Sequence, residues 1–104
     1  MVFNFSETPL HSASSNGHIS IVECLINHRA AIDVESSSGF NTGTPLHCAV
    51  RFGHIDVVEY LISQKASIHL KNTYGETSLD LAVKYNQSKI IEILSRKGKT
   101  SCRI

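Results

Sequence analysis

Apolar residues recur at helical spacing in three similar stretches of the chain. In the middle stretch, Ile55, Val58 and Ile62 fall on one face of a helix, with Val57 and Leu61 beside them. An apolar surface this broad predicts a helix that must be covered on both sides. Residues 17–26 repeat the pattern of residues 53–62 at a constant offset of 36, and residues 86–94 retain its apolar positions.

A shorter helix is predicted in front of each of these. The residues Thr-Pro-Leu-His stand at 8–11 and again at 44–47, and Thr-Ser-Leu-Asp stands at 77–80. A Thr side chain can accept a hydrogen bond from an unpaired amide of the first turn, and Pro at the next position has a preset backbone angle and no amide hydrogen. We therefore expect the short helices to begin after these threonines. They should end nine residues later, at Gly17, Gly53 and Asn86, because Gly and Asn tolerate a left-handed helix end.

The segments that join the units have a different pattern. Residues 66–70 alternate between apolar and polar positions, and residues 72–75 have the composition of a turn, which predicts an extended segment and a hairpin tip. The first tip, within residues 35–43, is longer by three residues, so the spacing between units is 36 residues and then 33. Self-similarity at such a spacing predicts a stack of supersecondary units.

The repeated Thr-Pro-Leu-His opening, the Gly-His turns and the second apolar helix resemble the unit of the ankyrin repeat family. The resemblance covers about residues 6–98, in three units. It implies an all-α fold, an ankyrin-repeat solenoid of stacked helix-turn-helix units joined by hairpin-like loops. We expect a single domain over residues 1–104, with repeats at about 6–38, 42–74 and 75–98 and a basic tail at 99–104.

The two end units of such a stack each lack one neighbour, and polar residues suit an outward face. Serine occupies positions 12, 14 and 15 of the first short helix. The last unit has Gln87, Ser88 and Ser95 where the middle unit has His54, Ile55 and Ile62. We interpret these polar residues as adaptations of the ends. The alternative, that the chain is a fragment of a longer array, is equally compatible with them.

Charge is unevenly distributed, although the net charge is only +1. Residues 1–83 contain 4 basic and 8 acidic side chains, whereas residues 84–104 contain 6 basic and 1 acidic. The basic end could attract an acidic partner or nucleic acid, but a solvated, partly frayed tail is the simpler interpretation. The cysteines at 24, 48 and 102 have no paired spacing, which favours a reducing compartment over a disulfide framework or a zinc module. Because there is no long apolar run or leader, we expect an intracellular, cytoplasmic protein, with the nucleus as an alternative.

His11 and His47 invite a catalytic or metal-binding interpretation, the second with Cys48 beside it. Adjacent side chains rarely converge on one ligand, however, and Asp80 takes the place of histidine in the third unit. The resemblance implies instead that these histidines bond backbone groups of neighbouring loops. The sequence contains no triad-like arrangement, paired carboxylates or glycine-rich phosphate loop. We therefore expect no enzymatic activity, no cofactor, no metal site and no small-molecule substrate.

In a stack of this type the second helices form a convex back, while the first helices and the hairpin tips line a concave side. The resemblance implies that recognition uses the tips and the two positions before each helix-ending Gly or Asn. A cation next to an exposed aromatic residue is typical of binding surfaces. The predicted partner-binding residues are Phe40, Asn41, Arg51, Phe52, Thr73, Tyr74, Glu76, Lys84 and Tyr85. The alternatives are that Phe52 and Tyr85 pack on neighbouring repeats and that Phe40 folds back on the core.

These observations predict a non-catalytic protein–protein interaction module that binds another protein through its concave face, as a monomer and without a membrane. An inhibitor or regulatory subunit of an enzyme would use the same surface and is an alternative. A nucleic-acid binder acting through the basic C-terminal end is a third possibility, which a steep salt dependence of binding would favour.

Overall fold

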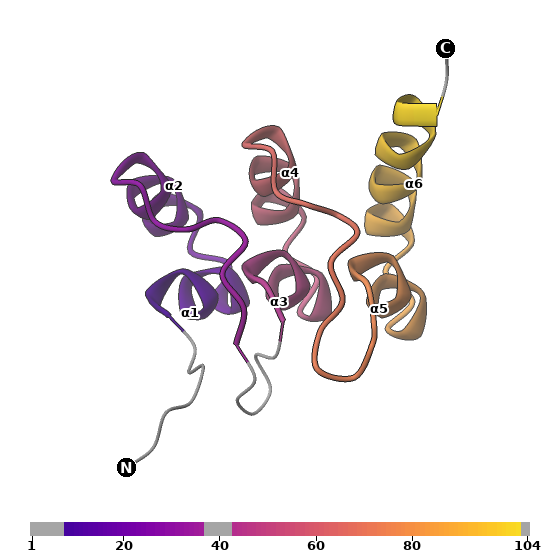
Figure 1. The fold of residues 1–104 in the computed structure, drawn as a ribbon, viewed down its shortest axis with the longest axis horizontal. Coiled ribbons are helices and arrows are strands. Elements are labelled where there is room, and N and C mark those ends of the chain that lie inside the picture. The colour runs from indigo at the N-terminus through magenta and orange to yellow at the C-terminus, as the bar shows by residue number, and fades with distance from the viewer. Residues whose placement is uncertain (1–7, 37–42, 103–104) are drawn as a thin grey trace.

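The computed structural model describes residues 8–36 and 43–102, with side chains as far as residue 96. The helices in these residues lie in two rows (Figure 1). The inner row contains the short helices α1 (Pro9–Asn16), α3 (Pro45–Arg51) and α5 (Ser78–Lys84). The outer row contains α2 (Ile19–Asn27), α4 (Ile55–Ser63) and α6 (Ser88–Cys102). The expected all-α stack of three helix-turn-helix units is confirmed.

Each inner helix begins at the predicted threonine, whose side chain accepts a hydrogen bond from the amide three residues later. The residue at that later position returns the bond, because its side chain accepts the amide hydrogen of the threonine at 3.0 Å in every unit. The pair is a capping box in which His11, His47 and Asp80 stand where Glu or Gln is usual. Two otherwise unpaired amides are thereby satisfied within each unit.

Neighbouring units pack inner helix against inner helix and outer helix against outer helix. Helix α3 lies between α1 and α5, and α4 lies between α2 and α6. Ala13, Ala49 and Ala82, small residues that let the inner helices approach one another, are all buried. Larger apolar side chains of the outer helices complete one continuous core along the stack: Val22, Val57, Val58, Leu61, Ile90 and Leu94. Stability therefore comes from contacts within each unit together with contacts between neighbouring units.

The inner helices end as predicted, in left-handed conformation at Gly17, Gly53 and Asn86, with φ of 71°, 74° and 57°. Gly17 has a second role at the junction with the next unit. A Cβ at this position would lie 2.6 Å from Nδ1 of His54. The His54 ring occupies this space and donates from Nε2 to the carbonyl of Ser15 at 2.8 Å. Glycine thus permits both the turn and the close approach of the second unit.

The interpretation of the polar end residues as outward-facing is wrong for Ser14 and Gln87. Ser14 is fully buried, and its hydroxyl has no hydrogen-bond partner among the described residues. Val83 occupies the same position in the third unit and is exposed, because no further unit lies beside it in this chain. The second unit therefore covers Ser14. Gln87 lies against Gly53, where a Cβ would be 3.0 Å from its side-chain amide, so it faces the second unit as well.

The joining segments contain no regular pair of strands in the described part of the chain. Ser36 and Gly43 form an isolated antiparallel bridge, with amide–carbonyl distances of 2.8 and 2.7 Å, at the base of the first tip. The second tip is a tight turn over residues 72–76 that projects beyond the inner row (Figure 1). Helix α6 continues to Cys102, through the first part of the segment predicted to be a basic tail.

Candidate functional site

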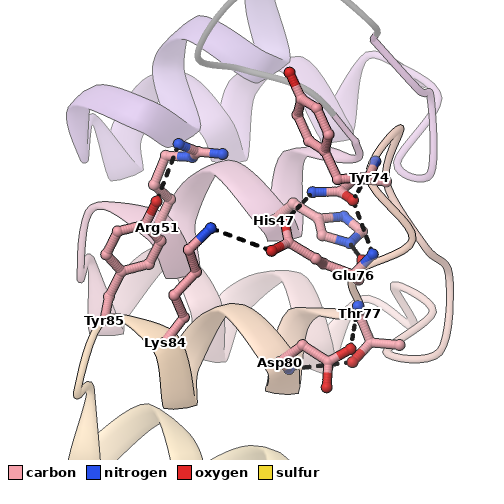
Figure 2. Close-up of polar contacts among 9 residues, drawn as sticks. His47, Arg51, Tyr74, Glu76, Thr77, Asp80, Lys84 and Tyr85 are labelled. Atoms are coloured by element: carbon pink, nitrogen blue, oxygen red, sulfur yellow. Dashed lines mark hydrogen bonds and ion pairs between the residues drawn. The ribbon is translucent and has the colours of Figure 1, made fainter.

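The predicted partner-binding residues that the structure describes belong to α3, α5 and the turn at 72–76. Figure 2 shows that side chains from these three segments gather on one side of the stack. We call this set the candidate surface; it consists of Arg51, Phe52, Thr73, Tyr74, Glu76, Lys84 and Tyr85. Phe40 and Asn41, the other two predicted residues, lie outside the described residues.

The turn at 72–76 is organised by the side chain of Asn72. Its Oδ1 accepts the amide hydrogens of Tyr74 and Glu76, both at 2.9 Å, and the backbone amide of Asn72 donates to the carbonyl of Glu76 at 2.9 Å. Its Nδ2 also donates to Oε1 of Glu76 at 3.0 Å. An Asn side chain bonded in this way holds a turn without help from a strand. The turn therefore presents Thr73 and Tyr74 from a fixed backbone.

His47 attaches this turn to α3. Its Nδ1 accepts the amide hydrogen of Thr44, so the neutral ring carries its proton on Nε2, which donates to the carbonyl of Glu76 at 2.8 Å. The pKa of His47 is lowered because burial disfavours the charged ring. The Glu76 carbonyl and the carboxylates of Glu35 and Glu76 favour the charged ring, but their effect is smaller than that of burial. The predicted structural role of the histidines is confirmed here, and His11 bonds the carbonyl of Gly43 in the same way at 2.8 Å.

Glu76 connects the turn to α5. Its pKa is lowered mainly by the hydrogen bond from the Asn72 side chain; burial opposes this effect, and Lys84 and Arg51 lower the pKa further. The Lys84 ammonium lies 3.3 Å from Oε2 of Glu76. The pair is partly exposed, so its contribution to stability is small, and its main effect is to fix the direction of the Lys84 side chain.

Tyr85 is contacted by cations from two different units. The guanidinium carbon of Arg51 lies 5.7 Å from the centroid of the Tyr85 ring, and the ammonium of Lys84 lies 5.6 Å from it. Arg51 also donates from Nη1 to the Tyr85 hydroxyl at 3.3 Å. The two distances to the ring centroid are within the range of cation–π attraction. The cluster spans the junction between the second and third units, as Figure 2 shows.

The aromatic side chains of the candidate surface differ in how they are held. Tyr85 is partly covered by Arg51, which agrees in part with the alternative that it packs on a neighbouring repeat. Phe52 and Tyr74 remain 48% and 71% exposed, so neither belongs to the core. In the first unit the position of Phe52 and Tyr85 is taken by Asn16, whose side-chain amide donates to the carbonyl of Ser12 in its own helix at 2.9 Å. The aromatic and cationic part of the surface therefore lies on the second and third units.

A groove beside this surface was not predicted from the sequence. It has a volume of about 370 Å³ and runs between the bases of the two tips. Its lining includes Glu35, Ser36, Lys71 and Thr73, of which Thr73 is a predicted binding residue. The groove depends on how closely two loops some thirty residues apart approach each other, for which the sequence has no local signal.

The described residues contain no group of three or more His, Cys, Asp and Glu side chains placed to hold a metal ion. Nor do they contain a helix with both the length and the apolar character needed to cross a bilayer. Both ring nitrogens of His11 and of His47 take part in the contacts described above. The chemistry available on the candidate surface is hydrogen bonding, cation–π attraction and apolar contact.

Comparison with known proteins agrees with the architecture. The family model for ankyrin repeats in three copies matches residues 2–72 and, in a second overlapping alignment, residues 37–103. The two matches together span almost the entire chain. No curated protein matches it significantly.

Proposed function

This chain belongs to the ankyrin repeat family, and we propose that it is a non-catalytic interaction module that binds a partner protein through the candidate surface. Ankyrin repeat domains generally act as protein–protein interaction modules and are typically non-catalytic. The proposal places recognition on the inner helices and the tips, on the second and third units.

The observation that carries the proposal is the exposure of two large aromatic side chains on rigid supports. Phe52 caps the C-terminal end of α3 and Tyr74 lies on a turn held by Asn72, and both are largely exposed. Aromatic residues and Arg are the types that contribute most to binding at interfaces. Because the backbone beneath them is already ordered, this chain loses little conformational entropy when a partner docks.

An inhibitor or regulatory subunit would use the same surface, so the two possibilities differ in what the partner does. If the bound partner is an enzyme, an activity assay with and without this chain separates them.

Nucleic-acid binding through the basic end is less well supported. Lys84 and Lys89 are already paired with Glu76 and Glu92, and the pairs leave less uncompensated positive charge at that end. A protein partner is therefore the better supported choice.

The test is affinity capture from an extract of the source cell, followed by measurement of the affinity for the partner so identified. We expect Phe52→Ala combined with Tyr74→Ala to weaken binding at least about tenfold, because truncating one central aromatic residue costs more than about 1 kcal/mol. Both side chains are exposed, so unfolding curves of this variant and of the native chain should coincide.

The matched control is Ile55→Ala combined with Glu59→Ala, which changes two exposed residues on the outer helix α4. It should bind the same partner with unchanged affinity. Equal capture by the native chain and by the Phe52/Tyr74 variant, with both folded, would place binding on another surface.

A further inference from the structure

The C-terminal end of the stack exposes positions that the two internal junctions bury. Leu46 and Val50 of α3 are almost completely buried because the third unit packs against them. Their equivalents in α5, Leu79 and Val83, are 37% and 58% exposed. We call this surface the trailing face; it consists of Leu79, Val83 and the partly buried Ile91, the equivalent of buried Val58.

The N-terminal end exposes the matching half of a junction. Ile21 of α2 is 49% exposed, whereas its equivalents Val57 and Ile90 are completely buried against the preceding unit. Beside it lies an almost wholly apolar groove of about 320 Å³. We call this surface the leading face; it consists of Ile21 with the groove residues Pro9, Leu25, Ala30, Ala31 and Val34.

Inside the chain, trailing positions of one unit always pack on leading positions of the next. This packing occurs twice, from the first unit to the second and from the second to the third. One molecule therefore carries both halves of a junction that already forms within it. We propose that the trailing face of one copy docks on the leading face of a second copy of this chain, so that the stack continues from molecule to molecule.

Several contacts of the internal junction would be missing between copies, so the association is weaker and reversible. Asp80 replaces the histidine whose Nε2 bonds the next tip, and a carboxylate cannot donate to that carbonyl. Asn86 has a Cβ where Gly17 leaves space for the ring of His54, and His18 of the second copy must turn aside there. The apolar contacts of the two faces then provide most of the attraction.

A contact between two different faces is heterologous and does not close on itself, so it extends into open chains of copies. The candidate surface shares no residue with the trailing or the leading face, and Figure 2 shows its side chains from α3, α5 and the turn at 72–76 gathered on one side of the stack. Successive copies would then present several identical surfaces to a partner, which raises avidity without new contacts. The proposal differs from the monomer expected from the sequence.

The experiment is sedimentation velocity of the full chain over a hundredfold range of concentration, with a thiol reductant present to prevent disulfide links. We expect the average mass to rise from that of the monomer to that of the dimer and of longer species. Val83→Arg and Ile21→Arg should each remain monomeric, because a buried unpaired charge opposes docking. Both positions are exposed, and circular dichroism should show unchanged helix content.

The decisive sample is an equimolar mixture of the two variants. Val83→Arg retains an intact leading face and Ile21→Arg an intact trailing face, so the mixture should form a dimer that grows no further. A constant monomer mass for the native chain overturns the proposal. So does a dimer formed by either variant alone, which would mean a symmetric contact or one through another surface.

Discussion

At the scale of single residues, His47 shows how one side chain serves its own helix and the neighbouring unit. The ring completes the cap of α3 through Nδ1 and holds the turn of the next unit through Nε2. The bond to Nδ1 needs the neutral ring, since an imidazolium has no acceptor nitrogen, whereas Nε2 donates in either charge state. A buried group that must stay neutral couples stability to pH.

The first prediction concerns this coupling. The pKa of folded His47 is lowered from 6.5 by burial, so between 6.5 and the folded value the unfolded chain binds a proton that the folded chain does not. The stability that His47 contributes is complete above about pH 6.5 and is lost as the pH falls from there toward the folded pKa. The slope for one such group is at most about 1.4 kcal/mol per pH unit.

Urea unfolding at a series of pH values between neutral and mildly acidic measures this effect. His47→Gln cannot titrate, and the difference in unfolding free energy between it and the native chain should shrink as the pH falls below about 6.5. His69→Gln, at an exposed loop position, is the control for the loss of a histidine and should leave the free energy of unfolding at neutral pH close to that of the native chain. A difference between the native chain and His47→Gln that stays constant with pH would contradict the assignment.

At the scale of elements, helix starts and inner-helix ends could be predicted from the sequence because their causes are local. A Thr cap acts on an amide three residues away, and Gly or Asn adopts positive φ by itself. The ends of α2 and α4 had no such signal. Arg29 and Lys65 turn there with φ of 71° and 75°, and the next amide in each case bonds back to Leu25 or Leu61 at 3.0 Å. The bond pattern is that of a Schellman helix end with a non-glycine residue in the left-handed conformation, and the alanine that follows packs against the core in both units.

The candidate surface was predictable in part for the same reason. Arg51 and Tyr85 were selected by their position before a helix end, which a repeat makes visible in the sequence. Arg51 and Tyr85 are 34 positions apart in the sequence, and their contact across a junction depends on the register of the two units. The role of Asn72 in ordering the turn also requires the folded loop, since the sequence indicates only that a turn is present.

The second prediction tests the junction between α1 and α4. Gly17→Ala and Gly75→Ala both place a Cβ at a positive φ, which costs about 1 kcal/mol or more. A Cβ at Gly75 would have open space around it, whereas a Cβ at Gly17 would lie 2.6 Å from Nδ1 of His54. We therefore expect Gly17→Ala to reduce the free energy of unfolding by at least about 1 kcal/mol more than Gly75→Ala does.

A double-mutant cycle identifies the cause. In a His54→Ala background the ring is absent, and Gly17→Ala should then cost about as much as Gly75→Ala. If the extra cost persists in that background, the close approach of His54 is not its origin.

At the scale of the whole molecule, the three units are unequal because only the middle one has two neighbours. Val50 of α3 is completely buried between units, and the equivalent Val83 of α5 is exposed. In a stack whose energy is a sum of units and junctions, opening an end unit breaks one junction, while opening the middle unit breaks two. Local stability should therefore be highest at the centre of the stack.

Hydrogen exchange of the backbone amides, measured at low concentration where copies are separate, should show this gradient. Amides of α3 and α4 should exchange most slowly, and those of α1, α2, α5 and α6 faster.

A pair of valine variants tests the role of the junctions. Val50→Ala leaves a space at a junction of the middle unit and should cost about 1.5 kcal/mol or more, accelerating exchange in all three units. Val83→Ala removes the same atoms from an exposed site and should change the exchange of α5 and α6 only slightly. Equal protection of all six helices would instead mean that the chain opens as one cooperative whole, with junctions too strong for any unit to separate first.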